Sequence, residues 1–438
     1  MSDTYRRRAT PFTSAVTALV LAVVTACGGG DTGSSTDGTL TVWVDATRMA
    51  AAKLYQKTHP SVPMKIVSYD GDANGSNYLQ TKVSLFNRTR EGWPDVVFSS
   101  QNNETTWAVD AGFTAPLNKG LLPRSLLDGW AEGANDPCTV DGTLYCLRND
   151  LSQTVLWYDA TLLTDWGYQV PATWEDYEAL GKRVAAEHPG YLVGSAGDTF
   201  TPEIYLWAGR CGANQITGPK AVTVDATGPN CARMAALLDT LIRNRTLATS
   251  SVFSSDFGKN LAGRILMMPG PAWFGGALFQ GTFKVPAGRI AVAPMPQWAD
   301  DVTAGDEPAV GNVGGGTWLL SAHTANRDAA ADFLTWVTTS DDYQGEEAPG
   351  YPAYGPAAKT WLANQASSGY YAGDIAPLRA AADQVWSGWG YGQFSQEAIW
   401  AATVTPGLNA GKSIVSLLPA WQEAIVNHAR ADGYEVKE

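Results

Sequence analysis

The sequence predicts an α/β protein that is built from more than one domain-sized unit. The chain has 438 residues, whereas a single domain has about 100–200 residues. Hydrophobic residues make up 45% of it and charged residues 17%, a balance typical of a globular protein and not of a disordered chain. β-rich and helix-forming segments alternate along it, which favours a mainly parallel sheet.

The first alternation lies at the beginning of the chain. Residues 40–45 are rich in β-forming side chains, 46–58 favour a helix, and 64–69 are β-rich again. Residues 78–90 favour a second helix and 95–98 a third, short strand. This β-α-β-α-β order predicts a parallel, doubly wound sheet.

The alternation continues through the middle of the chain. Thr173 and Asp176 match the start of a capping box, which predicts a helix reaching Glu187. Further helices are expected over 231–243 and 328–338, and strands over 145–150, 155–158, 264–268, 290–293 and 317–320. After residue 351 helices and loops rich in Gly, Pro and aromatic residues take over, ending in an amphipathic helix over 414–430.

The charge balance argues against nucleic acid as a partner. Lys and Arg number 30 and Asp and Glu 43, a net charge of −13, whereas nucleic-acid binding depends on basic side chains that release counterions. No basic run follows Arg8. The chain also contains 17 Trp and 17 Tyr. A core of this size does not need so many large rings, so we expect some of them to face a ligand.

The first residues predict export and membrane anchoring. Three arginines, residues 6–8, precede an uncharged, largely apolar stretch over 9–26 that is typical of a signal peptide and is diluted by too many polar residues to span a bilayer. Residues 24–27 resemble a bacterial lipobox, so residues 1–26 are expected to be removed and Cys27 to be lipid-modified, the alternative being an unmodified cysteine. Residues 27–38, rich in Gly, Ser and Thr, then form a flexible tether. The expected location is extracytoplasmic, on the outer face of the cell membrane.

The other four cysteines predict two disulfides, because the exported chain folds outside the reducing cytosol. Three pairings are possible, and we favour Cys138 with Cys146 and Cys211 with Cys231. Asp141 and Gly142 form a hairpin-turn signal that places the first two cysteines opposite each other. Zinc is a poor alternative, since neither cysteine pair has ligand-like spacing and the four histidines are scattered.

No metal site or cofactor is predicted elsewhere. Asp70, Asp72, Asn74 and Gly75 match the opening of a calcium-binding loop, but Thr81 stands where the loop needs a bidentate glutamate. The alternative is a polar turn that precedes a helix.

No catalytic motif is complete, so we expect a protein that is not an enzyme. A phosphate loop fails at Pro406, and the three glycines at 314–316 lead into a strand instead of a helix. A glycosidase stays open as an alternative, because it needs only two carboxylates across a sugar cleft. The adjacent acidic pairs, such as Asp300 and Asp301, lie in loop-like contexts that are more typical of solvated turns.

Several segments, in order along the chain, resemble one family. They are Gly142-Thr143-Leu144-Tyr145, Leu156-Trp157-Tyr158-Asp159 with Leu162-Leu163, Pro171-Ala172-Thr173-Trp174-Glu175-Asp176-Tyr177, residues 263–268 with Gly270-Pro271-Ala272-Trp273, and residues 329–337. Together they resemble the extracellular solute-binding proteins of bacterial ABC importers, specifically the large carbohydrate-binding family that includes maltose-binding protein. The resemblance covers residues 40–428.

The resemblance implies two α/β lobes, each a mainly parallel sheet flanked by helices, that close on a sugar about a hinge. The implied lobes are 39–148 with 297–345, and 149–296 with 346–438. The chain is expected to cross between them near 147–152, 295–298 and 344–351.

The implied function is that of a monomeric, lipid-anchored receptor that carries a mono- or oligosaccharide to the permease subunits of an ABC importer. A secreted glycosidase, or a receptor for a non-sugar solute such as a polyamine or a glycerophosphodiester, is the alternative.

A sugar offers hydroxyl groups to planar hydrogen-bonding side chains and an apolar face to aromatic rings. Trp273 matches the family's stacking tryptophan, although Ala272 is inserted before it, and a core position is the alternative. Trp386, Trp389 and Tyr391 alternate with glycines, a spacing that suits loop platforms better than a core.

Polar candidates come from the ends of predicted strands. Gln101, Asn102 and Asn103 follow the third strand, where open α/β sheets bind ligands. The remaining candidates are Asp45 and Arg48 after the first strand, Asn149 and Asp150 at the first crossing, and Trp318 after the three glycines. A helix-capping role is an alternative for Asp45.

Overall fold

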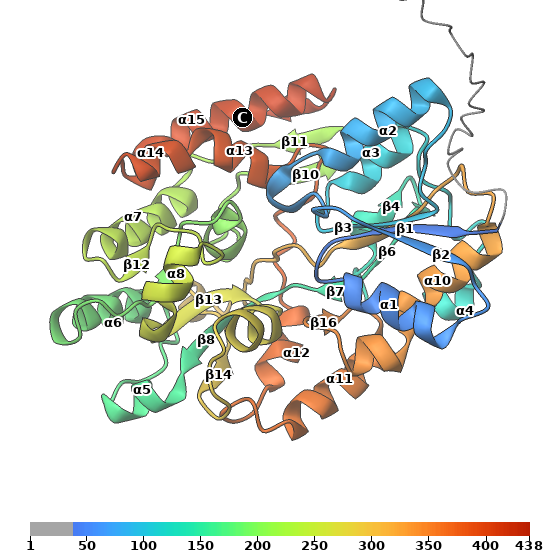
Figure 1. Cartoon of the computed structure of the whole chain (residues 1–438). Helices are drawn as coiled ribbons and strands as arrows, with labels where there is room; N and C mark the ends of the chain where they lie inside the picture. Colours follow the sequence, from blue (N-terminus) through green and yellow to red (C-terminus); the bar gives the residue numbers. More distant parts are fainter. Residues whose placement is uncertain (1–37) are drawn as a thin grey trace, which may run out of the picture. The chain divides into compact units, whose positions relative to one another are not determined.

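The computed structural model describes residues 38–438, and two separate β-sheets organise this part of the chain (Figure 1). The expected signal peptide, Cys27 and all of the tether except Gly38 lie outside the described residues. Within the described part, no helix has the length and apolar character needed to cross a membrane.

The first sheet has five strands in the order β2-β1-β3-β15-β6. Its strands are β1 (Leu40–Val44), β2 (Met64–Ser68), β3 (Val96–Ser99), β6 (Cys146–Arg148) and β15 (Thr317–Leu320). β1 pairs in parallel with both β2 and β3, as the β-α-β-α-β pattern predicted. β15 pairs antiparallel with β3 and with β6, so it alone runs opposite to the other four strands.

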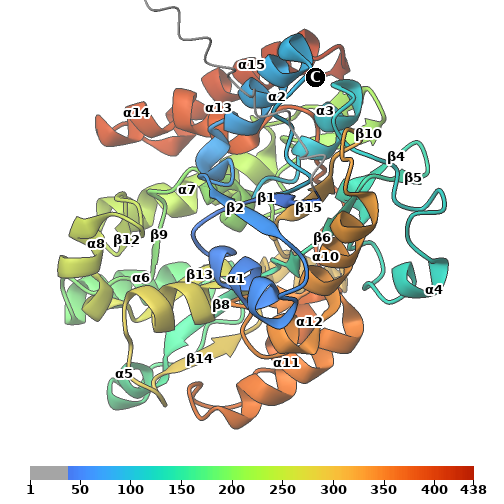
Figure 2. The same cartoon turned by 45° about the vertical axis from the view of Figure 1, so that its right-hand side comes forward.

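Helices cover both faces of this sheet (Figures 1 and 2). They are α1 (Met49–Thr58), α2 (Tyr78–Thr89), α3 (Glu104–Asp110) and α10 (Arg327–Thr339). α1 and α10 pack against each other through Tyr55, whose ring lies 5.0 Å from that of Phe333. All four residues of β3 are buried, as expected for a strand that is covered on both faces.

The second sheet has β8 (Thr154–Asp159) between β13 (Met267–Pro271) and β14 (Ile290–Ala293). Both neighbours run antiparallel to β8. A parallel bridge between Leu192 and Ile265 attaches the parallel pair β9 (Gly194–Ser195) and β12 (Leu247–Ala248). β8 is therefore the reversed strand here, as β15 is in the first sheet, and each sheet is otherwise parallel.

The reversed strands are the ones that the chain enters on passing from the other sheet. It passes from β6 to β8 between Arg148 and Thr154, and from β14 to β15 between Ala293 and Thr317. Both passages leave one sheet at the carboxyl end of a strand. The strand that follows therefore begins at the carboxyl edge of the other sheet and runs opposite to its neighbours there. The two-lobed α/β fold predicted from the sequence is confirmed, and the exact lobe boundaries stay a prediction.

A short ladder lies at the passages. β7 (Asp150–Leu151) pairs antiparallel with β16 (Tyr351–Pro352), after the π-helical turn η6 (Asp341–Gly345). The expected third crossing over 344–351 falls in this region.

The helices of the second lobe include α6 (Trp174–Glu187), whose limits match the predicted capping box and end. Thr173 Oγ1 accepts a hydrogen bond from the Asp176 amide at 3.1 Å. The other helices and turns between β8 and β15 are α5 (Ala160–Asp165), η3 (Pro202–Leu206), α7 (Pro229–Arg243), α8 (Ser255–Asn260), η4 (Ala262–Arg264), η5 (Phe274–Thr282) and α9 (Ala299–Ala304). The strand predicted over 264–268 begins later, at Met267, because Arg264 ends the η4 turn.

The last third of the chain is mainly helical, as predicted. Its elements are α11 (Gly355–Ser367), α12 (Ala376–Ala382), α13 (Gln396–Thr403), α14 (Thr405–Asn409), α15 (Ile414–Ala431) and β17 (Glu435–Lys437). α13 to α15 lie beside α7 in both views (Figures 1 and 2). β17 pairs in parallel with β11 (Ala221–Thr223), which forms a hairpin with β10 (Gln215–Gly218). The sequence did not predict β17, because three residues with two exposed charged side chains carry no strand pattern.

Both predicted disulfides are present and confirmed: Cys138 with Cys146 and Cys211 with Cys231. The first follows the turn η2 (Asp136–Cys138) and encloses the hairpin of β4 (Thr139–Val140) and β5 (Thr143–Leu144). Asp141 and Gly142 form its two-residue turn with φ of +49° and +71°, the conformation that Asp-Gly favours. Two further short turns precede this region, η1 (Ala73–Gly75) and α4 (Arg124–Leu127).

Candidate functional site

A small polar pocket lies at the carboxyl end of β3. Three parts of the chain line it: the loop after β3 together with Gly314, residues of the second lobe, and the segment that leads into α13. The lining residues are Ser100, Gln101, Asn102, Asn103, Glu203, Asn214, Gly314, Trp389, Gly390, Tyr391, Phe394, Gln396 and Glu397. The lining therefore brings together five residues that the sequence predicted, although they span nearly 300 positions of the chain. They are Gln101, Asn102, Asn103, Trp389 and Tyr391.

The amide side chains after β3 form the first wall. Parallel strands present such residues at the carboxyl edge of a sheet. Asn102 Nδ2 donates to the Gly314 carbonyl at 2.7 Å, and Asn103 Nδ2 donates to the Gln393 carbonyl at 3.1 Å. Gln101, Asn102 and Asn103 are all buried. These contacts join the first lobe to the segment before α13.

Arg148, the last residue of β6, fixes this wall from behind. Its guanidinium donates to the Asp150 carbonyl at 3.0 Å, to the Gly314 carbonyl at 2.7 Å and to Asn102 Oδ1. The sequence predicted its neighbours Asn149 and Asp150 but missed Arg148. An arginine that follows Cys146 and Leu147 in a buried strand was the available signal, since a buried charge needs fixed partners.

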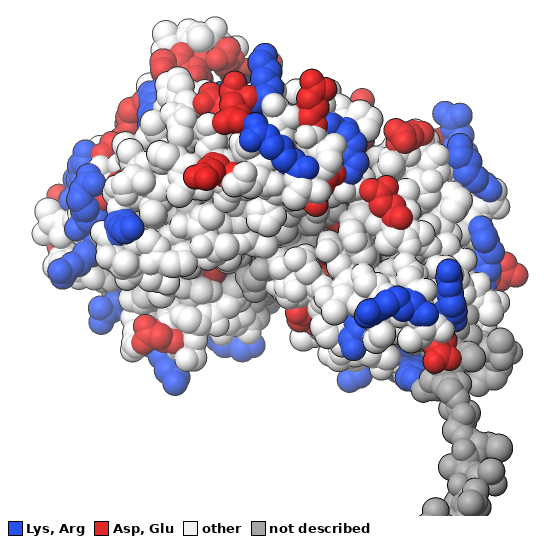
Figure 3. Space-filling view, turned by 90° about the horizontal axis from the view of Figure 1, so that it is seen from above, with Lys and Arg blue, Asp and Glu red and all other residues white. Residues whose placement is uncertain are grey.

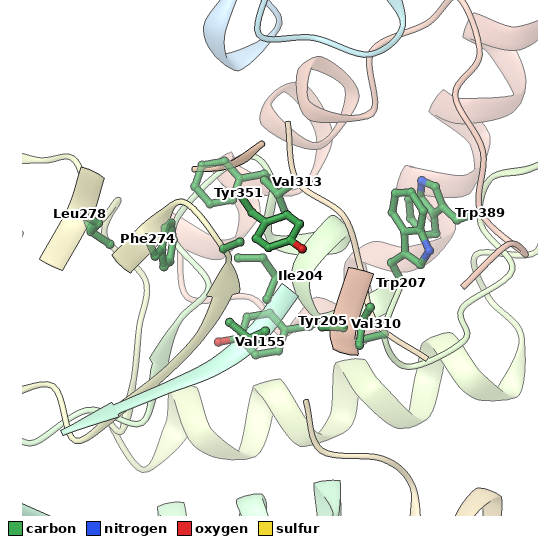
Figure 4. Close-up of a cluster of buried hydrophobic side chains, with 14 of the residues drawn as sticks. Val155, Ile204, Tyr205, Trp207, Phe274, Leu278, Val310, Val313, Tyr351 and Trp389 are labelled. Atoms are coloured by element: carbon green, nitrogen blue, oxygen red, sulfur yellow. The ribbon is translucent and has the colours of Figure 1, made fainter. Parts of the chain in front are cut away.

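Aromatic rings form the second wall. Trp389 stacks on Trp207, with ring centroids 5.4 Å apart and planes at 11°, and the two rings lie face to face in Figure 4. Tyr391 packs edge-on against Trp207, and its hydroxyl accepts a hydrogen bond from Asn312 Nδ2 at 2.6 Å. Glycine is needed between the rings, because a Cβ at residue 390 would lie 2.8 Å from Ile216 Cβ.

Two buried glutamates complete the lining. Burial raises the pKa of Glu203 well above its ordinary value; the charge of Glu397 raises it further, whereas Arg148 opposes the shift. Burial also raises the pKa of Glu397 to about 7, against hydrogen bonds from Gln101 and Thr199. The sequence did not predict either residue. Glu203 lies in the π-helical turn η3, a conformation frequent at functional sites, and Glu397 lies in the first turn of α13, capped by Ser395.

Several polar atoms in this lining have no hydrogen-bond partner among the described residues. They are Glu203 Oε2, Asn214 Oδ1, Trp389 Nε1 and both polar atoms of the Gln396 side chain, all inaccessible to solvent. Leaving a buried donor or acceptor unpaired costs about 1–3 kcal/mol. The pocket therefore contains several buried donors and acceptors without partners, next to the ring of Trp389.

A second group of predicted residues forms a network at the crossings, apart from the residues that line the pocket. Arg48 donates to Asp45 Oδ2 at 3.3 Å and to Asp150 Oδ1 at 3.2 Å. Asn149 Oδ1 accepts hydrogen bonds from Trp318 Nε1 at 2.9 Å and from Gln344 Nε2 at 3.0 Å. Burial raises the pKa of Asp150, and the charge of Arg48 opposes that shift. We call these residues the hinge network.

Asp45 accepts a hydrogen bond from the backbone amide of Arg48 at 2.7 Å, a contact that fits the alternative of a local capping role. Trp318 is fully buried and lies against the rings of Phe98 and Phe333. The ligand-binding roles predicted for the hinge network stay predictions.

Trp273 and Trp386 also lie outside the pocket lining. Trp273 belongs to an aromatic group with Phe200, Phe253 and Phe274, and its indole donates to the Val313 carbonyl at 3.0 Å. The carbonyl of Trp386 accepts a hydrogen bond from Trp207 Nε1 at 2.7 Å. Figure 4 shows Val313 and Phe274 close to Ile204 and Val155 in the hydrophobic cluster beside Trp207. A stacking role for these two tryptophans stays a prediction.

The described residues contain no group of three or more His, Cys, Asp or Glu that is arranged to hold a metal. In the calcium-like segment, Asp72 Oδ1 accepts hydrogen bonds from the amides of Tyr78 and Leu79 at 2.6 and 3.1 Å. These contacts fit the alternative of a polar turn before α2. On the face shown in Figure 3, charged side chains of both signs are scattered, and uncharged atoms border most of the central hollow.

Comparison with known proteins gives a consistent set of relatives. A model of the family described as bacterial extracellular solute-binding protein matches residues 38–344. The lactose-binding protein of Rhizobium radiobacter is 23% identical over 320 residues, which cover 69% of this chain and 71% of that protein.

Solved structures match the fold across nearly the whole chain. The ABC transporter-associated binding protein of B. animalis subsp. lactis Bl-04, in complex with β-1,6-galactobiose, has a TM-score of 0.76 at 21% identity and covers 92% of this chain and 100% of that chain. The galacto-N-biose- and lacto-N-biose I-binding protein of Bifidobacterium longum, in complex with lacto-N-biose, has a TM-score of 0.73 at 16% identity and covers 91% and 98%. At this level of identity the matches establish the two-lobed fold.

Proposed function

The chain belongs to the family of bacterial extracellular solute-binding proteins, and we propose that it is the receptor of an ABC importer for a carbohydrate that binds between its two lobes. Extracytoplasmic action follows from the family. Anchoring through a lipid on Cys27, a monomeric state and delivery to permease subunits are parts of the same proposal.

One observation carries the sugar assignment: the pocket combines unpaired amide and carboxyl oxygens with an aromatic wall. Each sugar hydroxyl both donates and accepts a hydrogen bond, so several hydroxyls can satisfy Asn214, Gln396 and Glu203 at once. The Trp389 ring offers an apolar surface to sugar C–H groups. The relatives named above bind lactose, β-1,6-galactobiose and lacto-N-biose, which supports the same ligand class.

The test is a binding panel of galactose, lactose, β-1,6-galactobiose, lacto-N-biose and maltose, followed by thermal unfolding and titration calorimetry. A ligand that binds only the folded state stabilises it by about 2.7 kcal/mol at a hundredfold excess over Kd. For a chain of this size that raises the melting midpoint by several degrees. Binding of at least one sugar, recovered chemically unchanged, is the expected result.

The variant test uses the first wall of the pocket. Replacing both Gln101 and Asn103 with alanine is expected to weaken sugar binding by more than about tenfold, since two hydrogen-bonding amides are lost. Gln56→Ala removes an exposed amide on α1 and serves as the matched control, with affinity unchanged. Absence of binding to every sugar would overturn the proposal, and hydrolysis of the sugar would favour a glycosidase instead.

A further inference from the structure

The pocket carries more negative than positive charge. Glu203 and Glu397 line it, and Asp198, also buried, acts electrostatically on Glu397. Arg148 is the cation that acts on Glu203. The phenol of Tyr391 is a further titratable group that acts electrostatically on Glu203. If all the acids ionise, three carboxylates face one guanidinium.

Arg148 cannot neutralise the glutamates directly. Its guanidinium donates to two backbone carbonyls, to Asn102 Oδ1 and to the Tyr391 hydroxyl, all of them neutral acceptors. Within residues 38–438, neither Glu203 nor Glu397 forms an ion pair. Glu397 Oε2 accepts a hydrogen bond from Thr199 Oγ1 at 3.3 Å, whereas Glu203 Oε2 has no partner. Arg148 therefore acts on Glu203 only through space, Glu397 has hydrogen bonds from Thr199 and Gln101 alone, and neither carboxyl is paired with a cation in the described chain.

Ionised carboxylates are costly to bury unless a charge and hydrogen bonds compensate them. Asp198 shows what compensation looks like, because Ser251 Oγ and the Val252 amide both donate to it. Glu203 lacks equivalent donors although it lies in the same lobe. A ligand that brings its own positive charge and its own N–H donors supplies what Glu203 and Glu397 lack.

We propose that the ligand is an amine-bearing sugar, whose ammonium group binds between the Glu203 and Glu397 carboxylates. The inference rests on the proposed carbohydrate function and narrows its substrate class. An ammonium donates three hydrogen bonds, and charge-assisted bonds to carboxylates are about twice as strong as neutral ones. The remaining hydroxyls bind the amide wall, and the Trp389 ring lies within the same lining.

Matched sugars test the inference. Three sets differ only at carbon 2, as hydroxyl, free amine or acetamide: glucose, glucosamine and N-acetylglucosamine; the three galactose counterparts; and cellobiose, deacetylated chitobiose and N,N′-diacetylchitobiose. In every set that binds, the free amine is expected to bind at least about tenfold more tightly than the hydroxyl, because it adds a charge-assisted interaction.

Proton linkage gives a second measurement on the unaltered protein. An ammonium favours the ionised form of both carboxyls, so amine binding near pH 6.5 releases protons, which calorimetry in two buffers of different ionisation enthalpy detects. Affinity for the amine falls as the pH drops below about 7, where Glu397 becomes protonated. The hydroxyl sugar, which needs no ionised pair, shows neither proton release nor this loss.

Isosteric variants show which residues cause the preference for the amine over the hydroxyl sugar. Glu203→Gln and Glu397→Gln each remove one carboxylate and are expected to reduce the preference for the amine over the hydroxyl to about twofold or less. Glu423→Gln changes net charge equally at an exposed position on α15 and should leave the preference intact.

The outcomes separate the two proposals. Tighter binding of the hydroxyl or acetamide member, or binding of neutral sugars with none of the amines, would overturn the amine assignment and leave the carbohydrate function standing. An amine preference that survives both glutamine variants would overturn the role of the glutamate pair. Binding of no sugar at all would overturn the carbohydrate function itself.

Discussion

Two polar networks lie between the sheets of this protein, and they differ in how far their members satisfy one another. In the hinge network, Arg48 pairs with Asp45 and Asp150, and Asn149 accepts from Trp318 and Gln344, which leaves two buried atoms, Arg48 Nε and Gln344 Oε1, without a partner in the described chain. In the pocket, Glu203, Asn214, Gln396 and Trp389 each keep at least one buried polar atom without a partner in the described chain. Both networks are buried, so exposure does not explain the difference.

The difference indicates that the hinge network mainly stabilises the fold, whereas the pocket has hydrogen-bonding groups left to bind a ligand. Buried hydrogen bonds and ion pairs between members stabilise one arrangement of the chain, whereas each unsatisfied group raises the energy of the folded state, and the pocket has more unsatisfied atoms than the hinge network. A ligand that supplies the missing partners offsets that energy on binding. We therefore expect substitutions in the two networks to change the free energy of unfolding differently, which unfolding experiments can measure.

The largest effect is expected from breaking the hinge network. Asp150→Ala leaves the largely buried guanidinium of Arg48 with one carboxylate instead of two, and removing one partner of a buried ion pair costs about 3–5 kcal/mol. Urea unfolding of the unliganded protein measures the loss. Adding Arg48→Met should recover part of it, because the uncompensated charge is then gone. A loss below about 1 kcal/mol in the single variant would show that the hinge network contributes little to stability.

The sequence could predict the features that depend on residues close together in the chain. The β-α alternation, the capping box at Thr173 and the Asp141-Gly142 turn depend on neighbours within a few residues, and all three are present in the structure. The amides after β3 were also predictable, because strand order in a parallel sheet fixes where that loop lies.

The glutamates of the pocket could not be predicted, since what makes them notable is set by distant parts of the chain. Glu203 and Glu397 are separated by 194 positions in the sequence, and neither lies in a motif. Arg148 reaches a carbonyl 166 residues away. Likewise, nothing local tells that Trp273 lies among Phe200, Phe253 and Phe274 instead of lining the pocket with Trp389.

A medium effect is expected in the pH dependence of stability. The pKa of Glu397 is raised to about 7 in the folded protein, so the folded state binds more protons than the unfolded state, and stability falls as the pH rises from about 4.5 to about 7. This group alone accounts for about 2–3 kcal/mol between those limits. Glu397→Gln should remove that part of the fall, measured as the difference between urea unfolding curves at pH 5 and pH 8.

Burial also shifts the pKa values of other groups, raising that of Glu104 and lowering that of His323. Their contribution is common to both proteins and cancels in the difference, whereas that of Glu203 does not, because the charge of Glu397 raises its pKa. The difference therefore reports on the glutamate pair. An unchanged pH dependence in Glu397→Gln would show that the pocket carboxyls are not under strain in the unliganded state.

The smallest effect comes from the same substitution made once in each network. Gln396→Met replaces an amide whose two polar atoms have no partner, and it should stabilise the unliganded protein by about 1 kcal/mol while weakening ligand binding. Gln344→Met removes hydrogen bonds of 3.0 and 2.7 Å to Asn149 Oδ1 and the Val337 carbonyl, and also the unpartnered Gln344 Oε1, so a net destabilisation of about 1 kcal/mol is expected. Both glutamines are buried, and methionine has nearly the same length, so transfer and packing terms are similar. Opposite signs in urea unfolding would establish the contrast between the two networks, and equal losses would mean that the pocket is as fully satisfied as the hinge.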